Sequence, residues 1–160
     1  MDQRQKTCCF TGHRQIPAFH ALPLQNALET TLRSLIQQGV IYYGAGGALG
    51  FDTMAALTVL RLRREFPLLR LILVLPCPQQ DQYWKPQEQA IYRQILAQAD
   101  KIIYLSPRYT PACMHQRNRH LIDHSGRCIA YLTKNSGGTA YTTAYAAKKG
   151  VPVINLAEKL

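Results

Sequence analysis

Short apolar runs alternate along the chain with longer stretches in which apolar residues recur every three or four positions. The runs are bounded by glycine, proline or polar residues, which is typical of buried strands, whereas the longer spacing is typical of amphipathic helices. We expect strands at residues 7–11, 40–43, 69–75, 101–105, 127–132 and 153–155. Each strand except the last is followed by a loop and then by a stretch with helical spacing.

The helical stretches also carry end signals. The apolar stripe of the first helix runs from Leu24 to Ile36, and Gly39 ends it. Thr110 is the expected cap of the fourth helix, with Pro111 in its first position. The other helices are expected at residues 53–66, at about 88–99, and from the turn at 136–139 to residue 149.

Strands that alternate with helices through short loops predict right-handed crossovers and a parallel sheet. We therefore expect a single α/β domain over residues 1–160. It would be Rossmann-like and doubly wound, with a mostly parallel sheet of about six strands and helices on both faces. Ligands of such sheets bind beyond the carboxyl ends of the strands. The loops that follow the strands are thus the candidate functional segments.

The loop after the first strand contains Gly12, His13 and Arg14. A guanidinium in this place could clamp a phosphate with two hydrogen bonds, and an imidazole could donate to the same group. The alternative is a tight turn at Gly12 with Arg14 in solvent.

A glycine-rich turn at residues 44–50 follows the second strand and leads into Asp52. Gly46, Gly47 and Gly50 would let the backbone approach an anion at the start of the next helix, and Asp52 would cap that helix or accept from a ribose hydroxyl. The spacing differs from the dinucleotide fingerprint and from the P-loop. The alternative is a turn that only permits close packing.

A second glycine turn follows the fifth strand and is made of Ser136, Gly137, Gly138 and Thr139. It places another helix start at the same edge of the sheet, where N–H groups and the helix dipole favour an anion. Two such helix starts indicate two phosphates, or one phosphate and a polar sugar.

The helix at 113–124 is basic, yet Asn118 falls on its apolar stripe and needs a polar partner there. Arg117 could reach from the edge of the helix to a phosphate or sugar; the alternative is a solvated basic face. Cys113, His120 and His124 share a side of this helix, but no second pair of ligands matches them, so we expect no metal site.

Two aromatic residues, Tyr83 and Trp84, lie in the loop after the third strand. They could stack on a base or cover the ligand, and they could equally pack the loop onto the domain. The sequence leaves both interpretations open.

The composition is that of a globular domain, with 160 residues of which 47% are hydrophobic and 18% charged. No apolar run approaches the roughly 18 residues of a membrane span. The amino-terminal apolar stretch is interrupted too early for a signal peptide, and five cysteines without Cys-x-x-Cys spacing argue against a disulfide framework. We expect a cytoplasmic protein that has no membrane partner.

Nineteen basic side chains against nine acidic ones give a net charge of +10. This balance is typical of proteins that bind phosphate, either on a nucleotide or on a nucleic acid.

Several of these segments together resemble the YpsA-like branch of the SLOG superfamily, over nearly the whole chain. They are residues 9–14, 46–52, 117–119 and 136–139, with the Pro76–Cys77 loop and Trp84. The superfamily gathers Rossmann-like proteins similar to DprA and to the LOG phosphoribohydrolases. The resemblance implies binding of a nucleotide or nucleotide-derived small molecule, as in sensing or signalling, and association into homo-oligomers. We expect no cofactor.

The resemblance also suggests a catalytic alternative, cleavage of the N-glycosidic bond of a nucleoside monophosphate. Residues 114–117 resemble the Met-His-x-Arg stretch of the LOG enzymes, but Ala144 stands where their catalytic Glu would be. A carboxylate normally stabilises the oxocarbenium-like state of such cleavage, so we lean against an enzyme. Asp52, Asp81 and Asp123 remain as substitutes that the spacing does not support.

A further alternative is a module that binds single-stranded DNA, because residues 117–119 resemble the Arg-Asn-Arg of DprA-like proteins. Binding along a strand needs a contiguous basic track with stacking platforms, whereas the basic residues here are scattered. A nucleotide-sized site is the preferred prediction.

Overall fold

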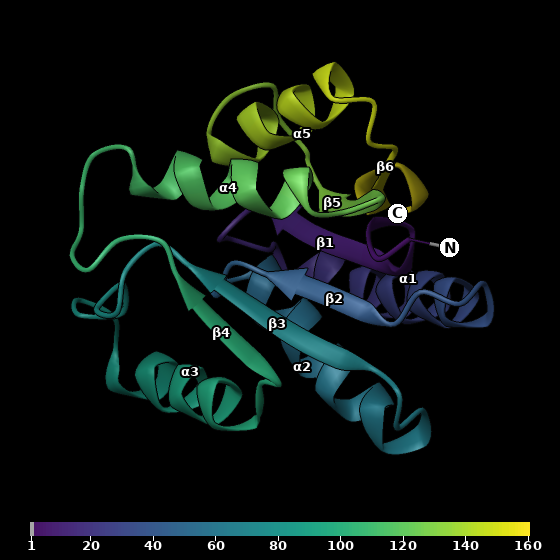
Figure 1. Cartoon of the computed structure of the whole chain (residues 1–160), viewed down its shortest axis with the longest axis horizontal. Coiled ribbons are helices and arrows are strands. Elements are labelled where there is room, and N and C mark those ends of the chain that lie inside the picture. The colour runs from purple at the N-terminus through teal and green to yellow at the C-terminus, as the bar shows by residue number, and fades with distance from the viewer. Residues whose placement is uncertain (1) are drawn as a thin grey trace.

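A six-stranded sheet is the centre of the computed structural model, which describes residues 2–160 (Figure 1). Its strand order is β4-β3-β2-β1-β5-β6, and all neighbouring strands are parallel. The strands are β1 (Thr7–Gly12), β2 (Tyr42–Ala45), β3 (Arg70–Leu75), β4 (Lys101–Tyr104), β5 (Arg127–Tyr131) and β6 (Val153–Asn155).

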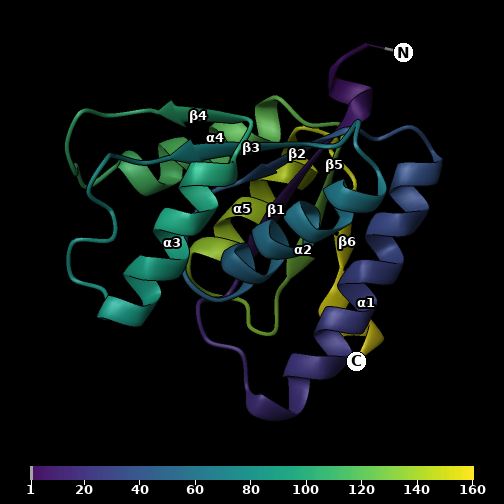
Figure 2. The same ribbon diagram turned by 90° about the horizontal axis from the view of Figure 1, so that it is seen from below.

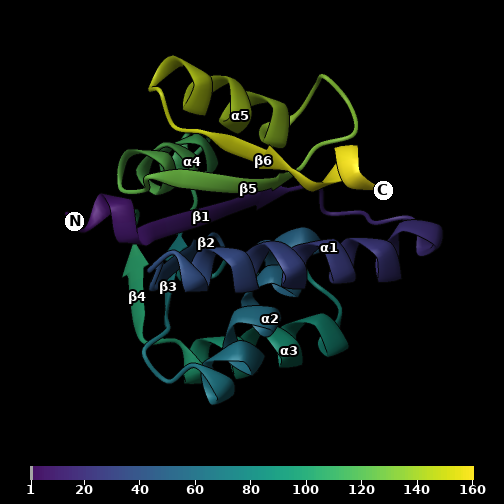
Figure 3. The ribbon, with the colours of Figure 1, turned by 90° about the vertical axis from the view of Figure 1, so that its right-hand side faces the viewer.

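Helices cover both faces of the sheet (Figure 3). One face carries α1 (Ala18–Gln37), α2 (Phe51–Glu65) and α3 (Pro86–Gln98), which lie side by side in Figure 2. The other face carries α4 (Cys113–Asp123) and α5 (Gly138–Lys148). Short 3-10 helices, η1 (Arg4–Lys6) and η2 (Leu156–Lys159), lie near the two ends of the chain. The predicted doubly wound, Rossmann-like fold is confirmed.

The central strand β1 is buried on both sides because it has helices above and below it. Successive side chains of a strand point to opposite faces. Phe10 accordingly packs in the larger core with α1, α2 and α3, whereas Cys9 packs in the smaller core with α4 and α5. A strand that is apolar at nearly every position, as the sequence has here, is the pattern of a sheet covered on both faces.

Most predicted strand and helix ends agree with the structure to within two residues, and the shifted starts of β2 and α4 have local causes. The strand β2 begins at Tyr42 because the Val40 N–H still donates to the Leu35 carbonyl at the end of α1. The prediction for the start of α4 was wrong. Thr110 does not cap this helix; its carbonyl accepts from Cys113 N–H in a turn, and α4 begins at Cys113 with no side-chain cap.

The strand order of the sheet reverses at the border between the neighbouring strands β1 and β5. After β1 it continues through β2 and β3 to β4, and it then crosses to β5 on the other side of β1. The connection after β1 leads to one face of the sheet and the connection after β5 to the other (Figure 3). Their loops diverge and leave a crevice at this topological switch point, which is where such sheets bind ligands.

None of the helices within residues 2–160 combines the length and the apolar character that crossing a membrane requires.

The fold predicts a stability effect at the end of β1. A Cβ added to Gly12 would overlap the ring of the fully buried Phe51. Gly12→Ala is expected to lower the free energy of unfolding by about 1–3 kcal/mol, the usual effect of overpacking. Urea denaturation measures this change.

Gly138→Ala is the matched control, because no atom lies within 4 Å of an added Cβ there. Its effect should stay within about 0.5 kcal/mol, as for other substitutions in open space. Equal losses in the two variants would contradict the packing argument.

Candidate functional site

A cavity of about 800 Å³ lies at the switch point, beyond the carboxyl ends of β1 and β5. Four segments form its wall: the end of β1 with the loop after it, the start of α2, the first turns of α4, and the β5–α5 loop. The lining residues are Phe10 to Pro17, Ala48, Asp52, Met114, His115, Arg117, Asn118, Thr133, Lys134 and Ser136 to Thr139.

Most of the residues predicted from the sequence meet in this cavity. Those that line it are Gly12, His13, Arg14, Asp52, Arg117, Asn118, Ser136, Gly137, Gly138 and Thr139. Gly46, Gly47, Gly50 and Trp84 do not line it. Sequence reasoning missed Lys134 and His115, although Lys134 follows the fifth strand closely and His115 lies two positions before Arg117.

Arg117 is the buried basic group of the site, with 4% of its surface exposed. Its Nε donates to Asn118 Oδ1 at 2.7 Å, and its Nη1 donates to the Gly46 carbonyl. The buried residues of α4 are Cys113, Arg117, Leu121 and Ile122, and Asn118 is only half-buried at the edge of this stripe. The alternative of a solvated basic face is therefore wrong for Arg117.

Asp52 is the acidic group of the site and is also buried. Its Oδ2 accepts from the Ala48 N–H at 3.3 Å, in the loop that precedes its own helix. Burial raises the pKa of Asp52, and the charges of Arg117 and Arg14 oppose that rise. Burial likewise lowers the pKa of Arg117, and Asp52 opposes this. The two groups thus compensate each other's charge in the floor of the cavity.

The glycines of the β2–α2 loop contact the chain itself. A Cβ on Gly46 would overlap the Arg117 guanidinium, and a Cβ on Gly50 would overlap the Arg14 carbonyl. The carbonyls of Gly46 and Gly47 accept from Gln80 Nε2 at 3.3 and 3.4 Å. These contacts show the close packing that was the alternative interpretation of this turn.

The start of α5 is open, in contrast to the start of α2. No atom lies within 4 Å of a Cβ built on Gly137 or Gly138, and no side chain caps the helix. Gly137 has a φ of 92°, which favours glycine and turns the chain into the helix. The first N–H groups of α5 therefore have no intrahelical partner and lie at the cavity wall, where they favour an anion.

His13 connects the loop after β1 to the loop after β5. Its Nε2 accepts from the Thr133 N–H at 2.9 Å, which leaves the proton of the neutral ring on Nδ1. Burial, and then the charge of Lys134, lower the pKa of His13. The ring is thus a neutral link between the two loops.

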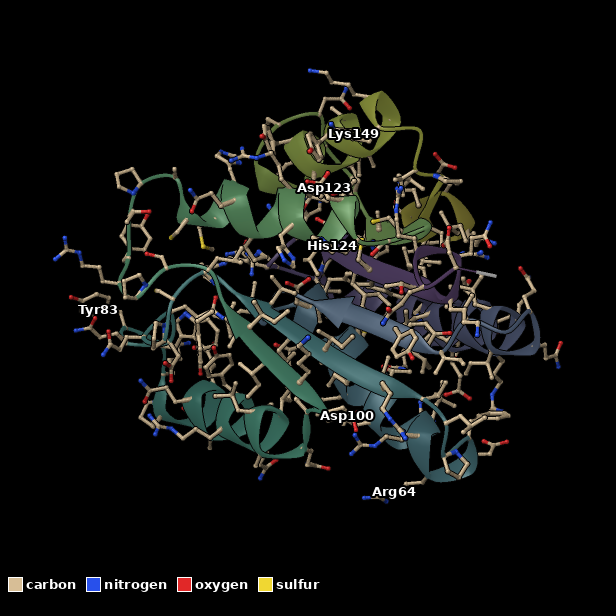
Figure 4. All side chains as sticks on the ribbon, viewed as in Figure 1. Arg64, Tyr83, Asp100, Asp123, His124 and Lys149 are labelled. Atoms are coloured by element: carbon tan, nitrogen blue, oxygen red, sulfur yellow. The ribbon has the colours of Figure 1, made fainter. Side chains whose placement is uncertain are left out.

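The aromatic pair after β3 lies away from the cavity. Trp84 is half-buried and packs edge-on against Tyr92, with ring centroids 5.1 Å apart. Tyr83 is 91% exposed, on the outer loop between β3 and α3 (Figure 4). Packing is therefore what the structure shows for Trp84, and neither ring covers the site.

The histidine pair of α4 is stacked, since the rings of His120 and His124 have centroids 4.1 Å apart. Cys113 is buried at the opposite end of the same helix. Within the described residues, no three His, Cys, Asp or Glu side chains are grouped as they would be around a metal ion.

One family model matches most of the chain. The model of the YpsA family, described as the YspA SLOG family, matches residues 10–152. The chain belongs to this family.

Relatives of the YpsA-family chain include bacterial proteins of similar length. It is 31% identical over 129 residues to a UPF0398 protein of Brevibacillus brevis, covering 79% of this chain and 69% of the relative. It is 30% identical over 140 residues to the SPbeta prophage-derived protein YoqJ of Bacillus subtilis, covering 79% and 82%.

Two solved structures share the fold of this family member. DNA processing protein A of Helicobacter pylori, studied for its single-stranded DNA binding mode, superposes with a TM-score of 0.66 at 21% identity. DprA of Streptococcus pneumoniae superposes with a TM-score of 0.67 at 15% identity. The matches cover 94% of this chain but only 64% and 50% of those chains.

The carboxylates of this YpsA-family member are distributed unevenly around the site. Ala144, which the resemblance to the LOG enzymes aligns with their catalytic Glu, is exposed and does not line the cavity. Asp81 and Asp123 do not line it either, and Asp123 accepts from the Tyr145 hydroxyl at the far end of α4. Of the substitutes considered from the sequence, only Asp52 is in place.

The environment of His13 predicts a loss of stability in acid. Because its pKa in the folded protein is lowered from 6.5, the unfolded chain binds the proton more readily. This contribution to stability is complete above pH 6.5 and is lost as the pH falls below it. In thermal melts from pH 8 to pH 5, His13→Gln should lose less Tm than the unsubstituted protein.

His120 also has a lowered pKa but does not line the cavity. His120→Gln is therefore the control, because it removes a histidine of this kind and keeps the bond between Thr133 and His13. The His13 effect should be accompanied by a loss of amide protection at Thr133 in acid, measured against the intrinsic exchange rate at each pH, because protonation removes the acceptor of that N–H. Parallel Tm curves for His13→Gln and the unsubstituted protein would contradict the assignment.

Proposed function

We propose that the protein binds a nucleotide or nucleotide-derived small molecule in the cavity at the switch point, with a phosphate at the start of α5. The observation that carries this proposal is that the uncapped α5 and the buried Arg117 line one cavity. A helix start supplies N–H donors and a positive dipole, and a guanidinium supplies charge and further donors.

The charges of the wall support an anionic ligand. Arg14, Arg117 and Lys134 line the cavity together with a single acidic residue, Asp52. In residues 2–160 no hydrogen bond occupies Nη2 of Arg117, because its two bonds use Nε and Nη1. Three basic residues against one acidic residue leave the cavity wall with a net positive charge, which is available to a phosphate.

The size and the lining support a ligand larger than phosphate alone. About 800 Å³ lies within the range of small-molecule sites. Ile16, Pro17 and Met114 give the wall an apolar part suited to a base. Asn118 uses its Oδ1 for Arg117, which leaves its Nδ2 to donate to a sugar hydroxyl, and Asp52 is placed to accept from one.

The presence of Asp52 in the cavity favours one second candidate, cleavage of the N-glycosidic bond of a nucleoside monophosphate. A buried carboxylate beside the ribose could stabilise positive charge on the sugar. Release of free base and ribose 5-phosphate from a nucleoside monophosphate would establish this activity.

We also propose, together with the binding of a nucleotide, that the protein is cytoplasmic and that it self-associates.

The proposal is tested by thermal stabilisation with nucleoside mono- and diphosphates, cyclic nucleotides, dinucleotides and ADP-ribose. A ligand at 100 times its Kd should stabilise the fold by about 2.7 kcal/mol. We expect a saturable rise in Tm with one of these classes. Arg117→Met and Gly138→Asp should each abolish it, by removing the guanidinium and by placing a carboxylate at the helix start.

Ala147→Asp adds the same charge at an exposed position near the other end of α5 and should keep the response. Each shift is measured against the variant's own Tm without ligand. An unchanged response in Arg117→Met and Gly138→Asp would overturn the proposed site. Binding of single-stranded DNA alone, with affinity that falls steeply with salt, would favour a polymer instead.

A further inference from the structure

Two side chains bind the backbone at the point where the chain leaves the sheet, after the end of β5. Asn155, the last residue of β6, accepts at Oδ1 from the Leu132 N–H and donates from Nδ2 to the Leu132 carbonyl, both at 3.0 Å. His13 accepts from the N–H of the next residue, Thr133. Consecutive residues are thus bound from opposite sides, once from β6 and once from the loop after β1.

These bonds begin where the main-chain pairing of the strands stops. The last register pairs of β5 are Ala130 with Asn155 on one side and Tyr131 with Gly12 on the other. Beyond them, the Asn155 amide provides the donor and the acceptor that another strand residue would have provided. The sheet is in effect extended by side chains toward the cavity.

The segment that follows has few other attachments. Residues 134–137 are exposed, and in the described part of the chain no hydrogen bond joins residues 134–136 to the rest of the protein. The start of α5 is therefore positioned by the packing of that helix at one end and by the bonds to Leu132 and Thr133 at the other. Loss of the bonds to Leu132 and Thr133 would let the turn at residues 136–139 move relative to Arg117.

We propose that Asn155 is a positioning residue that preorganises the start of α5 for the phosphate, an inference that rests on the proposed function. Asn155 does not line the cavity, so it acts through Leu132 and not by contact with a ligand. Its Oδ1 also accepts from the Ala157 N–H at the start of η2, which fixes the side chain in place. A turn that is fixed before binding loses less conformational freedom on binding.

Asn155→Ala in the full chain tests the inference, with inorganic phosphate as the probe. His13 is less suitable, because it lines the cavity and its loss would also remove a ligand contact. Asn26→Ala, at an exposed position of α1, is the matched control. Phosphate binding is followed by NMR at the amides of Gly138 and Thr139, and amide hydrogen exchange is followed over the whole chain without ligand.

Asn155→Ala should weaken phosphate binding about fivefold to tenfold, the effect of losing about one hydrogen bond's net stabilisation. It should also accelerate amide exchange at Leu132 and Thr133, the two N–H groups of this segment that donate hydrogen bonds, and leave the protection of β1 and α1 unchanged. Asn26→Ala should behave like the unsubstituted protein in both measurements.

The outcomes separate this inference from the proposed function. If the unsubstituted protein binds phosphate and Asn155→Ala binds it equally well, the positioning role is overturned and the site stands. If the unsubstituted protein does not bind phosphate, the proposed site fails, and unchanged exchange at Leu132 and Thr133 in Asn155→Ala would overturn the positioning role too. Acceleration throughout the chain would also overturn it, since Asn155 would then serve overall stability.

Discussion

The buried guanidinium of Arg117 is the constraint on which the rest of the site depends. A charge removed from water is costly unless it is paired and its N–H groups are bonded. The chain meets this requirement with three groups: the Gly46 carbonyl, the Asn118 side chain and the nearby Asp52 carboxylate. Gly46 must then be glycine, because any side chain would occupy the space of the guanidinium. The glycine at position 46 is thus explained by one arginine on α4.

The two glycine turns are unequal. At the start of α2, the Phe51 N–H donates to the His13 carbonyl and the Ala48 N–H donates to Asp52, so the chain itself uses this region. At the start of α5, the turn is open and uncapped. A single phosphate at α5, facing Arg117, agrees better with this asymmetry than two phosphates at two equivalent helix starts.

The open turn still needs a defined position, since an exposed glycine pair has many accessible conformations. The sheet provides it from both neighbours of β5, through His13 and Asn155. Similarity to DprA concerns the fold alone, at 21% and 15% identity. The local chemistry at the switch point is that of a buried Asp52 beside the buried guanidinium of Arg117.

The sequence by itself determined the order of the elements, the parallel sheet and the loops that surround the cavity. These follow from local periodicity, from end signals and from the rule that strands joined by helices run parallel. Only the tertiary structure decided which glycine turn is open, that Arg117 is the buried basic residue of α4, and that Trp84 packs away from the site. A one-residue difference in position rotates a side chain by about 100° around a helix, and that rotation is fixed by contacts between segments far apart in the chain.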